Sequence, residues 1–220
     1  HQILRWPVGA VSWETVAGTA GPGSAANQFN RPMDIYLDFN GDLYIADEYN
    51  HRIQKWTPVA VQGVTVAGGN GSGYEANQLN YPRGVGLDSL GNIYVLNDGN
   101  YFTRWAPGAT EGIWYANYLD HSQFVYIDPA GSIYTTNGSY QAVHKNTGGG
   151  NDWEVVAGGN CGGSASNQLN SPTDVFVDSV GNIYVADQSN HRIQKIQHSP
   201  QIVISAGETS GSITVTGIDD

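Results

Sequence analysis

One stretch of sequence occurs twice in the chain with few changes, and this repetition constrains the fold more than any other feature. Residues 41–55 read GDLYIADEYNHRIQK, and residues 181–195 read GNIYVADQSNHRIQK. Weaker copies begin at Gly91 (GNIYVLNDGN) and Gly131 (GSIYTTNGSY), so that successive copies are 50, 40 and 50 residues apart. A period of about 40–50 residues with four strands in each unit is typical of a β-propeller blade.

One repeat contains four segments with the composition of β-strands. These segments are residues 33–38, 43–47, 51–56 and 64–68. The first two are nearly continuous apolar runs, as expected of strands that are buried on both faces, whereas the third carries Arg52, Gln54 and Lys55. Between the first two, residues 38–41 form a turn that begins with Asp and ends with a Gly, which tolerates a positive φ. This polarity gradient favours blades that pack face to face around an axis.

Both ends of the chain depart from the full repeat. Residues 1–6 align with the third strand at residues 51–56, so we expect the first blade to lack its inner half. Residues 1–197 are therefore predicted to be an all-β β-propeller of four-stranded antiparallel blades, with three full repeats and a partial blade at each end. Closure of the ring would give five or six blades. Residues 198–220 are predicted to be either its closing strands or the start of a second β module.

The best-kept copies follow a longer pattern: Pro-x-Gly/Asp-Val, then Asp-x-x-Gly-Asn-Ile-Tyr-Val-Ala-Asp, then Asn-His-Arg-Ile-Gln-Lys. This pattern resembles the NHL repeat, which is named after Asn, His and Leu. The matching residues are Asn50, His51 and Ile53 in one copy and Asn190, His191 and Ile193 in the other. The resemblance spans residues 1–196 and implies a β-propeller, commonly of six blades. It implies no single function, because NHL-like propellers bind proteins, sometimes bind RNA, and in a few cases are lyases.

The C-terminal tail resembles a different family, and more weakly. Residues 201–207 (QIVISAG) and 212–217 (SITVTG) are similar to the strand pair near the end of Calx-β-type modules of bacterial surface proteins. The alternative is that residues 202–206 supply the fourth strand of the last blade.

Charge and cysteine content restrict the partners and the location. Nine Lys and Arg residues against twenty Asp and Glu residues give a net charge of −11. Such a chain repels a phosphate backbone, so we expect no nucleic-acid partner. No apolar run approaches the length of a membrane span, so we expect no membrane insertion. The single cysteine, Cys161, excludes an internal disulfide. Together with the tail, these features favour a secreted or cell-surface protein.

Two blades deviate from the repeat in loops that share one face of a propeller. Residues 98–101 (DGNY) replace the segment at 48–51, and residues 137–140 (NGSY) replace the corresponding corner of the next blade. That next blade also follows a shorter connecting loop. The deviation reflects either drift of the repeat or a ligand-binding patch, since aromatic and amide-rich concave surfaces suit glycans and peptides. The candidate ligand-binding residues are Asp98, Tyr101, Tyr118, His121 and Tyr140.

The histidines and the repeated carboxylates do not form a catalytic or metal-binding pattern. Three histidines are equivalent in the repeat and are predicted to be architectural: His1, His51 and His191. The other three are not equivalent and lack the spacing of metal ligands: His121, His144 and His198. Asp47 and Asp187 end second strands and are predicted to cap the following turn. Residues 38–42 faintly resemble a calcium loop but lack its glutamate. We therefore predict no catalytic residues, no metal site and no cofactor, with calcium as a minor alternative.

The resulting functional prediction is a non-enzymatic, extracellular or cell-surface binding and adhesion module. It would recognise a protein or a glycan, including carbohydrate chains, through the loop face of the propeller. One alternative is a self-assembling structural protein that binds further copies of itself through open blade edges. A second alternative is a lyase or hydrolase with a site in the central channel. That alternative requires a non-repeating histidine or carboxylate along the axis, and the sequence shows no such set.

Overall fold

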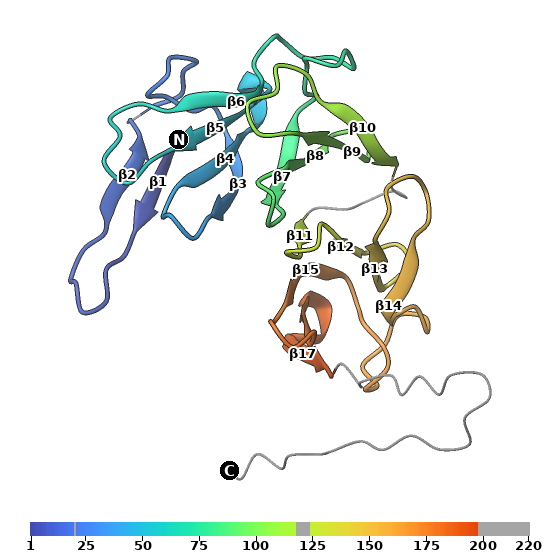
Figure 1. The fold of residues 1–220 in the computed structure, drawn as a ribbon. Helices are drawn as coiled ribbons and strands as arrows, with labels where there is room; N and C mark the ends of the chain where they lie inside the picture. The colour runs from blue at the N-terminus through green and yellow to red at the C-terminus, as the bar shows by residue number, and fades with distance from the viewer. Residues whose placement is uncertain (20, 118–123, 198–220) are drawn as a thin grey trace, which may run out of the picture.

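The computed structural model describes residues 1–19, 21–117 and 124–197, and nearly all of their regular structure is β-strand. The strands form antiparallel sheets that follow one another along an arc (Figure 1). Four of these sheets, with three or four strands each, are arranged as a four-bladed β-propeller, and a two-stranded sheet precedes them. The predicted all-β propeller class is thus confirmed, with partial blades at both ends of the described chain.

Within each sheet the strands pair in chain order. The first sheet consists of β1 (Gln2–Arg5) and β2 (Glu14–Gly18). The second contains β3 (Pro32–Leu37), β4 (Leu43–Asp47), β5 (Arg52–Trp56) and β6 (Val64–Gly68). The third contains β7 (Pro82–Leu87), β8 (Ile93–Asn97), β9 (Tyr101–Trp105) and β10 (Ile113–Asn117). The fourth contains β11 (Val125–Ile127), β12 (Ile133–Asn137), β13 (Ala142–Asn146) and β14 (Glu154–Gly158). The last contains β15 (Pro172–Val177), β16 (Ile183–Asp187) and β17 (Arg192–Ile196).

The first strand of each full sheet is its innermost strand. β7 contacts both β3 and β11, and β11 contacts β15, so these strands line the inner side of the arc. The first sheet has only two strands, and the expectation that the first blade lacks its inner half is confirmed. The predictions for residues 198–220 lie outside the described residues. Two short 3₁₀ turns, η1 (Glu48–Asn50) and η2 (Gln188–Asn190), are the helical segments of the described residues, and neither could span a membrane.

The hairpin between the first two strands is built on a repeated aspartate. The Asp38 Oδ1 accepts hydrogen bonds from the backbone N–H groups of Asn40 and Asp42, each at 2.9 Å. Gly41 follows with a φ of 82°, which an L-residue with a Cβ adopts only with strain. The turn predicted from the sequence is therefore present, and the side chain of its first residue holds it closed.

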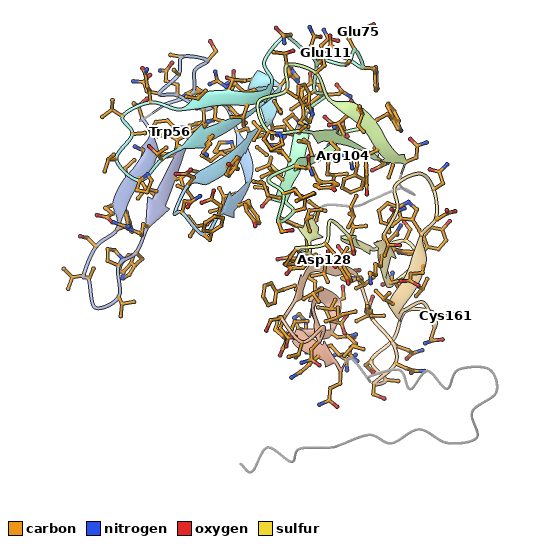
Figure 2. All side chains as sticks on the ribbon, viewed as in Figure 1. Trp56, Glu75, Arg104, Glu111, Asp128 and Cys161 are labelled. Atoms are coloured by element: carbon orange, nitrogen blue, oxygen red, sulfur yellow. The ribbon has the colours of Figure 1, made fainter. Side chains whose placement is uncertain are left out.

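Apolar side chains fill the space between neighbouring sheets. Ile53 of β5 is fully buried and belongs to a cluster with Val85, Leu87 and Val95 of the third sheet. Trp56 points from β5 toward the first sheet (Figure 2) and packs against Phe29, with ring centroids 5.7 Å apart. Blade-to-blade packing thus buries both faces of the second strands, as their continuous apolar sequence predicted.

The third strand of the second sheet is more buried than its sequence predicts. In β5, Arg52 is 8% exposed and Gln54 is fully buried. The reason is that the loop before β3 folds over this strand, and the Arg52 guanidinium donates to the backbone carbonyls of Ser24, Ala25 and Gln28. Polar residues of the strand are therefore buried with hydrogen-bond partners, which periodicity alone does not reveal.

Two side chains join the second sheet to the third. The His51 Nδ1 accepts a hydrogen bond from the Tyr81 N–H at 3.2 Å, and the Asp34 Oδ2 accepts one from the Val85 N–H at 2.9 Å. His1 makes the equivalent contact with the Arg31 N–H at 3.0 Å. These contacts give His1 and His51 the architectural role that the repeat predicted.

Inner strands at the two ends of the described arc have exposed outer faces. Leu37 on β3 is 62% exposed because the two-stranded first sheet has no inner strand beside it, whereas the equivalent Leu87, covered by the second sheet, is 6% exposed. On the last described sheet, Phe176 is 54% and Ile193 is 70% exposed. Within the described residues, the inner strand of the third sheet is therefore covered on both faces.

The buried carboxylate at the end of β4 is expected to carry much of the local stability. Asp47 is fully buried and accepts hydrogen bonds from the Asn30 N–H, the Asn50 Nδ2 and the Arg52 Nε. We expect Asp47→Ala to lower the free energy of unfolding by about 3–5 kcal/mol, because Arg52 is left buried without its partner. Urea unfolding followed by tryptophan fluorescence measures this loss.

Asp187→Ala is the matched control. Asp187 makes the same contacts in the last sheet, but the side chain of its partner Arg192 is 31% exposed, against 10% for Arg52. We expect a smaller loss because water can solvate the released guanidinium. A loss below about 1 kcal/mol for Asp47→Ala would contradict the prediction, since that value is typical of an exposed ion pair.

The Asp34 carboxyl is expected to make the free energy of unfolding depend on pH, in a direction that its pKa defines. Burial raises the pKa of its carboxyl from 3.8 to about 6, and the negative charge of Asp174 adds to the rise. A raised pKa in the folded state means that the associated stability is present at low pH and is lost as the pH rises through about 6. We expect the stability of the wild type relative to Asp34→Asn to fall between about pH 4 and pH 6, as measured by urea unfolding. A pH-independent difference would contradict this assignment.

Candidate functional site

A cavity of about 500 Å³ lies at the loop end of the joint between the second and third sheets. We call it the rim pocket. Its walls come from the loop before β3, from η1 and the corner that follows, and from the beginning of β7 and the turn after β8. The lining residues are Asn30, Arg31, Glu48, Tyr49, His51, Tyr81, Arg83 and Asp98. Because Arg83 stands on an innermost strand, the pocket lies toward the inner side of the arc.

Glu48 is the buried carboxylate of the rim pocket. It is the first residue of η1 and is 2% exposed. The Arg31 Nε lies 3.1 Å from its Oε2, and the Arg83 Nε lies 3.9 Å from its Oε1. Burial raises the pKa of Glu48, and the two guanidinium groups oppose this rise. Its Oε2 receives no hydrogen bond of standard geometry among the described residues. A buried carboxyl with a raised pKa beside a cavity is a typical acid–base group.

Arg83 is a residue of the pocket that the repeat does not explain. The equivalent positions carry Met33 and Thr173. Its side chain is 39% exposed, and it forms ion pairs with Glu48 and with Asp98, whose Oδ1 lies 3.1 Å from the Arg83 Nη2. A guanidinium has five N–H donors, and Arg83 makes no hydrogen bond of standard geometry to another described residue. Its Nη1 is in neither ion pair and is therefore the nitrogen most open to a ligand in the pocket.

Aromatic side chains form the outer edge of the rim pocket. Tyr49 and Tyr81 meet edge to face with their centroids 5.9 Å apart, and the Arg31 guanidinium lies 5.3 Å from the centre of the Tyr49 ring. The His51 ring lies 4.4 Å from that of Tyr81. Burial lowers the pKa of His51, so the neutral imidazole accepts the Tyr81 N–H at Nδ1 and carries its proton on Nε2.

Two further carboxylates stand on innermost strands. They are Asp34 on β3 and Asp174 on β15, and burial raises the pKa of both. The sequence predicts no carboxylate along the axis, because these two occupy the same position of the repeat and match its pattern. The oxygens of Asp34 accept the N–H groups of Ile35 and Val85. Asp34 is thus committed to the backbone, whereas Glu48 has an oxygen without a hydrogen bond.

The three described residues of the predicted ligand-binding patch have different surroundings. Asp98 lines the rim pocket. Tyr101 is 2% exposed and stacks on Trp114, with centroids 4.3 Å apart, so it belongs to the packing of the third sheet. Tyr140 is 54% exposed on the fourth sheet and lies beside His144. The remaining two predicted residues, Tyr118 and His121, lie outside the described residues.

The sequence analysis missed the other charged residues of the pocket: Arg31, Glu48 and Arg83. Arg83 could have been found from its departure from the repeat. Glu48 could not, since the segment containing it was read as an ordinary corner between strands.

The rim pocket holds no metal-binding cluster. Over residues 1–19, 21–117 and 124–197, no group of three or more His, Cys, Asp or Glu side chains is placed to bind a metal ion. In the segment that faintly resembles a calcium loop, the Asp38 Oδ1 is bonded to the turn and Asp42 forms an ion pair with Lys55 at 2.7 Å. The carboxylates of this segment are therefore used by the protein itself.

A larger cavity of about 730 Å³ lies at the opposite, hairpin end of the sheets. Its walls include the aromatic side chains of Tyr36, Tyr126 and Phe176. Its carboxylate Asp88 accepts hydrogen bonds from the turn and from the Tyr94 hydroxyl. The rim pocket, with its buried carboxyl and two guanidinium groups, is the better candidate for chemistry.

Comparisons with known proteins agree with this architecture. The family model "NHL repeat" matches residues 29–56 and 169–196. No curated protein matches the chain. Among solved structures, a gluconolactonase from Xanthomonas campestris has a TM-score of 0.57 and 14% identity, over 80% of this chain and 59% of its own.

Two lyases are also similar in structure. A streptogramin B lyase has a TM-score of 0.50 and 13% identity, over 86% of this chain and 60% of its own. A catalytically inactive virginiamycin B lyase from Staphylococcus aureus, solved with quinupristin, has a TM-score of 0.50 and 12% identity, over 87% and 61%. This chain thus spans about six tenths of the length of these structures. At such identities the likeness shows the fold.

The comparisons also correct the functional prediction. All three similar structures are enzymes or an inactivated enzyme, which contradicts the expectation of a non-enzymatic binding and adhesion module. The chain is therefore a β-propeller that carries NHL repeats at residues 29–56 and 169–196.

Proposed function

We propose that this chain is a propeller enzyme, a lyase or hydrolase, in which Glu48 of the rim pocket transfers the proton. The observation that carries the proposal is the position of Glu48: a buried carboxyl with a raised pKa, between two guanidinium groups and beside a cavity of about 500 Å³. The enzymatic nature of the similar propellers supports it.

The reactions named for those propellers share two requirements. A lactonase opens a cyclic ester with water, and a lyase breaks a bond by elimination. Both need a group that accepts or donates a proton, and both develop negative charge that must be stabilised. The rim pocket offers Glu48 for the first and the N–H donors of Arg83 for the second.

For an ester substrate the steps can be assigned to single groups. The Glu48 carboxylate takes a proton from a water molecule while the water oxygen forms a bond to the carbonyl carbon. Arg83 donates hydrogen bonds to the oxyanion that forms. When the ester C–O bond breaks, the proton on Glu48 passes to the departing alkoxide. The product is a hydroxy acid, and Glu48 is again ionised for the next turnover.

The predicted location and the excluded partners remain predictions. The net charge of −11 still argues against nucleic acid as a partner, and a secreted or cell-surface location remains our proposal. A small molecule is the substrate class that fits the rim pocket, because its volume lies within the range of small-molecule sites.

Glu48→Gln tests the proposal directly. Gln is the residue at the equivalent position 188, so the fold accepts it. With D-glucono-δ-lactone and quinupristin as probes, we expect kcat for the substrate that is turned over to fall by about 10²–10⁴-fold, the usual contribution of a general acid–base group. Steady-state kinetics with circular dichroism as the check on folding gives the answer.

Gln188→Glu, in the last sheet, is the control and should leave the rate unchanged. Because the base must be ionised, kcat/KM of the wild type should rise with pH through the raised pKa of Glu48, and Glu48→Gln should remove this rise. A folded Glu48→Gln variant with full activity would contradict the proposal. So would a wild-type chain inactive on both the lactone and the lyase substrate.

A further inference from the structure

The charges of the rim pocket point to a class of ligand. We infer that the pocket binds hydroxycarboxylates, whose carboxylate is held jointly by Arg83 and Arg31. The inference rests on the proposed function in one respect: a hydroxy acid is the product of ester ring opening. It makes a separate claim about binding, which can be tested without measuring turnover.

The first step concerns the donors that point at the cavity. Arg83 has ion pairs with Glu48 and Asp98 but makes no hydrogen bond of standard geometry to another described residue. Arg31 lines the same cavity with a side chain that is 52% exposed. Both guanidinium groups flank Glu48, with Nε atoms 3.1 and 3.9 Å from its two oxygens. The Arg31 Nη1 already donates to the Tyr49 hydroxyl and to the Glu48 Oε1, and the Arg83 Nη2 is paired with Asp98. A carboxylate that enters beside Glu48 therefore meets the remaining terminal nitrogens, Nη2 of Arg31 and Nη1 of Arg83, and guanidinium groups bind carboxylates well.

The second step concerns charge. Two guanidinium groups face two carboxylates, Glu48 and Asp98, so the pocket is neutral when all four are ionised. Burial raises the pKa of Glu48, which favours its protonated form. Once Glu48 is protonated, one positive charge is left unneutralised. An anionic ligand then restores the balance, and the protonated Glu48 can donate a hydrogen bond to it.

The third step concerns the rest of the ligand. The cavity of about 500 Å³ suits a molecule of a few carbon atoms. The Tyr49 hydroxyl, which already accepts from the Arg31 Nη1 at 3.0 Å, and the half-exposed Asp98 carboxylate can bond to hydroxyl groups. These polar walls favour a hydroxylated acid over a purely apolar one.

The internal repeat shows that the fold does not require this set. The equivalents of Arg83 are Met33 and Thr173, those of Arg31 are Tyr81 and Ser171, and that of Glu48 in the last sheet is Gln188. Neighbouring blades thus join without the two arginines, so their presence at this joint calls for a reason other than packing.

The test uses sodium D-gluconate as the probe and sorbitol, a neutral polyol with the same number of carbon atoms, as its match. Isothermal titration calorimetry on the whole chain should show binding of gluconate and none of sorbitol at the same concentrations. Affinity should rise as the pH falls toward the range in which Glu48 gains its proton. Arg83→Met, which installs the residue found at position 33, should weaken gluconate binding about 10- to 100-fold.

Arg5→Met is the matched control, because Arg5 pairs with Glu14 on the first sheet, away from the rim pocket. It should leave gluconate affinity unchanged. Equal binding of gluconate and sorbitol, absence of gluconate binding, or equal weakening by both substitutions would each overturn the inference.

The outcomes also separate the two proposals. If Glu48→Gln loses turnover but the wild-type chain does not bind gluconate, the proposed function is supported and the inferred carboxylate site is wrong. If the chain binds gluconate through Arg83 but turns over neither probe substrate, the inferred carboxylate site is supported and the proposed function is wrong.

Discussion

The buried polar residue that ends β4, β8 and β16 makes the contact on which the loop face depends. Asp47 accepts the Asn30 N–H from the loop that enters its own sheet, at 2.7 Å, and also holds Asn50 and Arg52 of the following corner. Asn97 makes the corresponding contact with the Asn80 N–H at 3.0 Å. Since these residues are directly followed by Glu48 and Asp98, the same interaction that anchors the loops also fixes the carboxylates of the rim pocket.

The rim pocket arises because one joint departs from a repeat that is otherwise kept. His51 and Asp34 join the second sheet to the third through the backbone N–H groups of Tyr81 and Val85, and these contacts do not involve the side chain at position 83. The position directly after the proline of the repeat, here Pro82, can therefore vary, and it carries Arg83. The scaffold supplies the geometry through the backbone, and the chemistry is added by side chains that the backbone contacts do not constrain.

The sequence is sufficient to predict the strands of a blade but not the residues of the rim pocket. The strands at residues 43–47 and 64–68 were predicted with the bounds that the structure has, because their apolar pattern and flanking turns are local signals. Burial raises the pKa of Glu48 against the opposing charge of Arg83 from the next sheet, and no local pattern records which charges of neighbouring sheets meet. Tyr101 looked like a surface aromatic because its stacking partner, Trp114, lies on the adjacent strand β10.

The uncovered faces of the end sheets have a consequence for where the protein opens. In an array of packed sheets, stability is approximately a sum of contributions from each sheet and from each joint between neighbours. Within the described residues, the last sheet, with Phe176 and Ile193 exposed, and the two-stranded first sheet each have one joint, whereas the second and third sheets have two. Fraying from either end therefore leaves the joint between β3–β6 and β7–β10 closed. The rim pocket is built across that joint, so its charges keep their spacing through fluctuations that loosen the ends of the arc.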